Sequence, residues 1–64
     1  MEYPYPKVDE RWKNVQFPTR VVTILRLYLH PKSKNTMVTY EYDDDALVMQ
    51  DVADHFTDNF VKVT

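Results

Sequence analysis

The sequence predicts a mainly β fold: a small barrel or a strongly bent meander sheet, with one short helix before the last strand. Several short segments alternate apolar with polar residues, which is typical of strands, and turn-forming residues separate them. The chain has only 64 residues, so it can form one domain with a small core. We expect an extended N-terminal arm over residues 1–10 and a single β-barrel-like domain over residues 11–64.

The first elements are the arm and a short strand. Tyr3 and Tyr5 alternate with prolines, and proline restricts the residue before it to extended conformations. Residues 11–17 then alternate between two faces until Pro18, which cannot continue a central strand. We therefore expect a short strand directly after the arm.

Residues 19–30 predict the longest strand, because they are rich in β-branched and aromatic types that suit a pleated surface. One face is expected to carry Val21, Leu25, Leu27 and Leu29. The opposite face mixes apolar and basic side chains, namely Arg20, Val22, Ile24, Arg26 and Tyr28. A mixed face is typical of a strand that passes from covered to solvated surroundings.

Two hairpin turns and two strands are expected next. Residues 31–35 form a polar turn in which Asn35 takes the left-handed conformation that glycine usually supplies. Residues 36–42 alternate with a clean period of two and form a strand. Residues 43–45, all aspartate, form the second turn, and residues 46–50 return as a short strand.

The chain is expected to close with a short helix and an edge strand. Asp51 is of the residue type that caps helix N-termini. Val52, Phe56 and Phe60 recur every four residues and predict the apolar side of a helix of one or two turns. Residues 61–64 are mostly β-branched and predict a terminal strand on the sheet edge.

The composition argues against several classes of site. The chain has no glycine, which P-loops, dinucleotide-binding fingerprints and nucleophile elbows all require. It has no cysteine, and His30 and His55 lack the paired spacing of zinc sites. We therefore expect no catalytic residue, no metal, no cofactor and no enzymatic activity. Lack of cysteine, of a secretory signal and of a membrane-spanning run predicts a cytoplasmic protein with no membrane contact.

Charge and aromatic residues predict a protein-binding surface. Seven acidic residues and no lysine or arginine occur between Glu41 and Asp58, so an acidic side could steer a basic partner. Aspartate also suits turns and helix starts, and that structural explanation stays open. Aromatic rings near prolines make good contact anchors unless the arm folds back over the core. The candidate residues are Tyr3, Tyr5, Trp12, Asp43, Asp44, Asp45, Asp54 and Asp58.

Nucleic-acid binding is an alternative, because basic and aromatic residues interleave in the first half of the chain. Against it stand the calculated isoelectric point of 5.5 and the acidic second half, which repel a polyanion. The candidate residues for this alternative are Arg11, Lys13, Arg20 and Arg26.

A hairpin-rich meander, a helical turn and a final short strand are expected from the segments RVVTILRLYLH, NTMVTYEYDDD and DHFTDNFVKV. Over residues 11–64 this order resembles small SH3-like β-barrels and the short accessory proteins of bacteriophages and prophages. The resemblance implies an accessory protein in the cytoplasm of a bacterial host. Trp12 is the only tryptophan, so the tryptophan pair of peptide-binding SH3 domains is missing and proline-rich ligands are not implied.

Three functions therefore remain open. The preferred one is a protein-interaction module that uses its acidic side or its aromatic arm, with another protein or a second copy as partner. The alternatives are a nucleic-acid-binding barrel and a structural subunit that self-associates. Fold resemblance alone does not choose among them.

Overall fold

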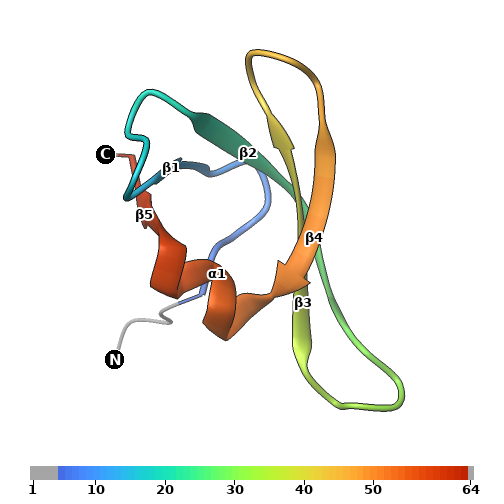
Figure 1. The fold of residues 1–64 in the computed structure, drawn as a ribbon. Helices are drawn as coiled ribbons and strands as arrows, with labels where there is room; N and C mark the ends of the chain where they lie inside the picture. The colour runs from blue at the N-terminus through green and yellow to red at the C-terminus, as the bar shows by residue number, and fades with distance from the viewer. Residues whose placement is uncertain (1–4, 64) are drawn as a thin grey trace.

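The computed structural model describes residues 5–63, which form five strands and one helix (Figure 1). Along the chain these elements are β1 (Arg11–Asn14), β2 (Val21–Leu29), β3 (Thr36–Tyr42), β4 (Val48–Val52), α1 (Ala53–Asn59) and β5 (Phe60–Lys62). The strands form one sheet in the order β4-β3-β2-β1-β5, and every neighbouring pair is antiparallel.

The sheet is open, with β4 and β5 as its two edges. A mainly β fold with one short helix before the last strand is therefore confirmed, whereas closure into an SH3-like barrel is not. The fourth strand begins two residues later than predicted, and the last strand begins one residue earlier.

Chain connectivity requires the sheet to bend. Helix α1 has seven residues, about 10 Å at 1.5 Å per residue, yet it joins the two opposite edges of the sheet. In a flat sheet those edges would lie about 19 Å apart, four spacings of roughly 4.8 Å. The sheet therefore curls around one face, which α1 covers (Figure 1).

That covered face, here called the core face, holds the hydrophobic core. Phe56 of α1 is fully buried, and its ring stacks on Phe60 with ring centres 4.4 Å apart. The ring centres of Tyr40 and Phe56 lie 4.9 Å apart. Burial raises the pKa of the Tyr40 hydroxyl to about 12. The buried hydrophobic residues are Trp12, Val22, Ile24, Val38, Tyr40, Ala53, Phe56 and Phe60.

A β-bulge at Leu25 decides which side chains of β2 reach the core. Ile24 and Arg26, on either side of Leu25, pair with adjacent residues of β3, so Leu25 is extra in the ladder. Val22 and Ile24 before the bulge are buried, and Leu27 after it packs against the core. The predicted face of Val21, Leu25, Leu27 and Leu29 is therefore wrong, and Leu25 and Leu29 are 41% and 61% exposed.

Both hairpin turns use the same four-residue geometry without glycine. In the β2–β3 turn, Lys34 donates its N–H to the His30 carbonyl and adopts a φ of 63°. In the β3–β4 turn, Ala46 donates its N–H to the Tyr42 carbonyl and adopts a φ of 55°. The left-handed residue is thus Lys34, not Asn35 as predicted, because it is the fourth loop position that must reverse the chain.

The N-terminal arm packs on the sheet from Tyr5 onward. Pro6 is fully buried, and Tyr5 packs against the core cluster. The Asp9 N–H donates to the Ile24 carbonyl, and the Ile24 N–H donates to the Glu10 carbonyl, both at 2.9 Å. These bonds hold the arm beside β2 next to the bulge. Tyr3 lies outside the described residues.

Candidate interaction surface

Residues 43–45 between β3 and β4, here called the aspartate turn, pair with Arg11 and Arg20, which precede β2 in the chain. Asp43 accepts hydrogen bonds from the Arg11 guanidinium and, at 2.8 Å, from the Thr23 hydroxyl. The Arg20 guanidinium lies 3.3 Å from Asp45 and 3.7 Å from Asp44. Residues that the sequence assigned to two rival sites therefore form one group of ion pairs.

Strand pairing explains this meeting. β2 lies between β1 and β3, so the residues before β2 and after β3 arrive at the same end of the sheet. The Asp43 N–H donates to the Val21 carbonyl at 3.0 Å, which fixes the turn there. Arg20 also lies over the Tyr42 ring at 4.4 Å. Exposed ion pairs contribute only about 0–1 kcal/mol each, but they reduce the field that the aspartates present to a partner.

The other predicted acidic residues lie elsewhere. Asp54 and Asp58 are on α1, which follows β4, while the aspartate turn precedes β4. β4 alone is about 16 Å long at roughly 3.3 Å per residue, and Figure 1 shows the turn and α1 well apart. Asp54 accepts a hydrogen bond from the Tyr5 hydroxyl at 2.5 Å. The aspartates therefore do not gather on one side of the molecule.

Trp12, a predicted contact anchor, is a core residue that is 7% exposed. Its indole N–H donates to Glu10, which also accepts from the Lys7 N–H and lies 3.0 Å from the Lys62 ammonium. Burial opposes ionisation of Glu10, but the hydrogen bonds from Lys7, Lys62 and Trp12 outweigh it and lower its pKa below 4.5. Glu10 therefore joins the arm, β1 and β5.

The remaining basic candidates lie on the outer face, opposite the core face. Lys13 and Arg26 are exposed, and the Arg26 guanidinium lies 4.7 Å from the centre of the Tyr28 ring. The β2–β3 hairpin carries Lys32 and Lys34 at its exposed turn, which projects from the rest of the fold (Figure 1). Within residues 5–63, none of these four basic groups forms an ion pair.

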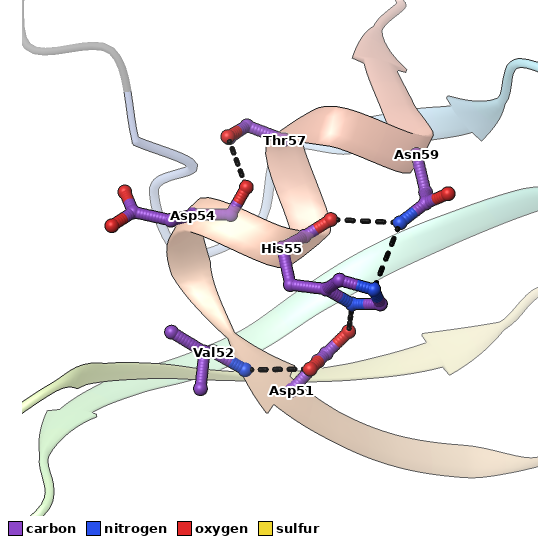
Figure 2. A network of polar contacts seen from close by, with 6 residues as sticks. All are labelled: Asp51, Val52, Asp54, His55, Thr57 and Asn59. Atoms are coloured by element: carbon purple, nitrogen blue, oxygen red, sulfur yellow. Dashed lines mark hydrogen bonds and ion pairs between the residues drawn. The ribbon is translucent and has the colours of Figure 1, made fainter. Parts of the chain in front are cut away.

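A polar network joins the end of β4 to α1 (Figure 2). Asp51 Oδ2 lies 2.5 Å from His55 Nδ1, and Asp51 Oδ1 accepts the Val52 N–H at 2.8 Å. Asn59 donates to the His55 carbonyl at 2.9 Å. The hydrogen bond and the negative charge of Asp51 raise the pKa of His55 above 6.5, with a smaller effect from Asp58.

This network corrects the role predicted for Asp51. The helix N-cap is Val52, which makes no side-chain cap hydrogen bond, so Asp51 precedes the cap and binds His55 instead. Figure 2 shows the Asp54 carboxylate pointing away from the His55 ring, although the two residues are adjacent in sequence. The four-residue spacing of Asp51 and His55 was the available signal for this pair.

The β4 edge is the feature that charge-based sequence reasoning missed. Leu47, Val48 and Met49 are 49%, 52% and 43% exposed. The Tyr42 N–H donates to the Leu47 carbonyl at 2.9 Å, and antiparallel pairing alternates along the strand, so Leu47 and Met49 direct their backbone groups toward β3. Val48 and Gln50 direct their N–H and C=O groups away from β3, toward the free edge.

The opposite edge is blunted. β5 has only three residues and includes Lys62, whose ammonium pairs with Glu10. Short length and lysine are two common ways in which proteins protect an edge strand from pairing. β4 has five residues and contains neither lysine nor proline. The signal in the sequence was the apolar run after the aspartate turn, but only the sheet order shows that this run lies at an edge.

The chain matches no protein-family model, no curated protein and no solved structure in the comparisons. Within residues 5–63, no helix has both the length and the apolar character needed to cross a membrane.

Proposed function

We propose that the chain is a non-catalytic protein-interaction module that binds a partner strand along the free edge of β4. In β-strand addition, backbone hydrogen bonds supply affinity and alternate side chains supply specificity. The observation that carries the proposal is the outward backbone of Val48 and Gln50 within an exposed apolar edge. The accessory role in a bacterial host, expected from sequence, forms part of this proposal.

Side chains along β4 support strand addition. The Tyr28 hydroxyl donates to Gln50 Oε1 at 2.8 Å, which holds the Gln50 side chain on the outer face. The Val52 N–H, next in the outward series, is already bonded to Asp51. The available backbone therefore consists of two residues, Val48 and Gln50, flanked by apolar side chains. The aspartate turn is a weaker candidate, because Arg11 and Arg20 already occupy its carboxylates.

The test is a pull-down from source-organism lysate with and without nuclease, using an isotopically labelled bait so that native copies of the chain can be told from bait. Val48→Pro removes one outward N–H without removing a bond to β3, since proline is tolerated where the N–H faces away from the sheet. Far-UV circular dichroism and Trp12 fluorescence verify that this variant folds. We expect wild type to retain a protein after nuclease treatment and Val48→Pro to lose it.

The matched control removes the acidic charge of the turn. Asparagine at positions 43–45 is preferable to lysine, because lysine would be placed against Arg11 and Arg20. We expect this triple variant to bind as wild type does. If the triple variant loses the partner while Val48→Pro retains it, the aspartate turn and not β4 is the binding surface.

Nucleic-acid binding remains a second candidate because of one observation: no acidic residue balances the basic charges over residues 21–40 of the β2–β3 hairpin. Residues 21–40 contain Arg26, Lys32 and Lys34 and no acidic residue. Binding of a single-stranded oligonucleotide, followed by fluorescence anisotropy, should weaken steeply between about 50 and 200 mM salt. The double variant Lys32→Ala, Lys34→Ala should then bind more weakly than wild type. Absence of binding at the lower salt concentration contradicts this candidate.

A further inference from the structure

We infer that the partner at the β4 edge is a second copy of this chain, paired antiparallel about a two-fold axis at Met49. The pairing would join two five-stranded sheets into one continuous sheet. This dimer presupposes the proposed function, because it uses the same outward backbone groups of Val48 and Gln50. It goes further by naming the partner and the register.

The outward N–H and C=O groups of β4 can pair with the same groups of a second copy. With the axis at Met49, Val48 lies opposite Gln50 of the second copy, and Gln50 lies opposite Val48 of the second copy. Both residues direct their N–H and C=O outward, and an antiparallel hydrogen-bonded pair exchanges two bonds. Each of the two pairs therefore forms two bonds. The two-fold interface uses the β4 edge of both copies, so only the short β5 edges stay free.

Neighbouring two-fold registers conflict with hydrogen bonds that the chain already makes. An axis at Val48 would pair Gln50 with Ala46 of the second copy, but Ala46 lies in the turn, has a φ of 55° and already donates its N–H to the Tyr42 carbonyl. An axis at Gln50 would pair Val48 with Val52 of the second copy, but the Val52 N–H already donates to Asp51 at 2.8 Å. The Met49 register avoids both conflicts.

Side chains on the core face favour the same register. Met49 pairs with Tyr40, so it lies on the core face, and it would meet Met49 of the second copy. Leu47 would lie opposite Asp51 of the second copy, whose carboxylate is bonded to Val52 and His55 within its own chain. No lysine, arginine or proline occurs between Ala46 and Val52 to oppose the contact. The two Met49 side chains, each 43% exposed in one chain, would thus cover each other.

Sedimentation velocity over a wide range of protein concentration measures the association. We expect the mass to rise from one chain to two, and we expect Val48→Pro and Met49→Lys to stay at one chain. Val61→Lys is the matched control, because Val61 is exposed on the opposite edge strand, and it should associate as wild type does. A wild-type protein that stays at one chain at every concentration overturns the inference.

Cross-linking tests the register. The chain has no cysteine, and Met49→Cys would place two thiols in a directly opposed, non-hydrogen-bonded pair, with Cα atoms about 4.5 Å apart. We expect mild oxidation to convert Met49→Cys to a disulfide-linked dimer and to leave Val48→Cys and Val61→Cys largely monomeric. A wild-type dimer in which Val61→Cys cross-links and Met49→Cys does not would overturn the pairing at β4.

The two proposals fail in different ways. If purified wild type stays monomeric but still captures another protein that Val48→Pro loses, the second copy is not the partner and the β4 edge remains the binding surface. If wild type neither associates nor captures a protein, both proposals fail. If association persists in Val48→Pro and Met49→Lys, the dimer forms through another surface.

Discussion

Phe56 should be the most sensitive single position in the fold. Its side chain is fully buried, and its ring centre lies 5.5 Å from Trp12, 4.9 Å from Tyr40 and 4.4 Å from Phe60. Truncating a buried phenylalanine to alanine costs about 3–5 kcal/mol, through lost transfer free energy and the cavity left behind. At roughly 0.05–0.15 kcal/mol per residue, a 64-residue domain has a free energy of unfolding of about 3–10 kcal/mol. Phe56→Ala should therefore lose a large part of that free energy, at least about a third.

Urea unfolding followed by the fluorescence of Trp12, the only tryptophan, measures this loss. Phe56→Leu keeps most of the volume and should cost about 1–2 kcal/mol, so it gives a measurable midpoint even if Phe56→Ala does not fold. Phe17→Ala is the matched control, because Phe17 is 60% exposed and its truncation should cost less than about 0.5 kcal/mol. Equal losses from Phe17→Ala and Phe56→Ala would refute the placement of the core.

Two further changes test the turn and the polar network. Ala46→Gly should stabilise the fold by roughly 0.5–1 kcal/mol in urea unfolding, because alanine at a φ of 55° is strained by more than glycine loses in entropy, whereas Ala53→Gly in α1 should destabilise it. The pKa of His55 is higher in the folded state, so its stabilising contribution is fully present below pH 6.5 and is lost as pH rises through the folded-state value. As pH rises through that value, the urea midpoint of wild type should fall by more than the midpoint of Asp51→Asn. Parallel pH profiles of the two midpoints would count against the Asp51–His55 pair.

Local pattern was a sound guide where a segment has one buried face. Residues 36–42 alternate cleanly, and β3 has those bounds, with Val38 and Tyr40 buried on the predicted face. The same reasoning wrongly placed Val21 on one face with Leu27 and Leu29: Val21 pairs with the exposed Lys13, whereas Leu27 pairs with the buried Val38. A bulge changes the phase of alternation, and it depends on how β2 pairs with β3 and on the arm that bonds to Ile24, not on the types of residue within β2.

Charge reasoning shows the same limit. The sequence separates basic residues in the first half from acidic residues in the second, and this separation predicted an acidic side and, as an alternative, a basic nucleic-acid site. Folding brings Arg11 and Arg20 against the three aspartates of residues 43–45. The reason is that β2 lies between β1 and β3, so the residues before β2 and after β3 lie at the same end of the sheet. The ion-pair partners lie more than 20 residues apart in the chain. No local sequence pattern predicts that such distant residues will meet.

The sequence by itself determined that this chain forms mostly strands with one short helix, because strand and helix periods are local properties of neighbouring side chains. It also determined that the hairpin turns are built without glycine. Only the tertiary structure decided that Leu25 is an exposed bulge residue and that Arg11 and Arg20 pair with the aspartate turn. It alone decided that Leu47, Val48 and Met49 lie at an unprotected edge. These features depend on which strands become neighbours, and strand neighbours are chosen by the packing of the whole chain around Phe56 and not by any one segment.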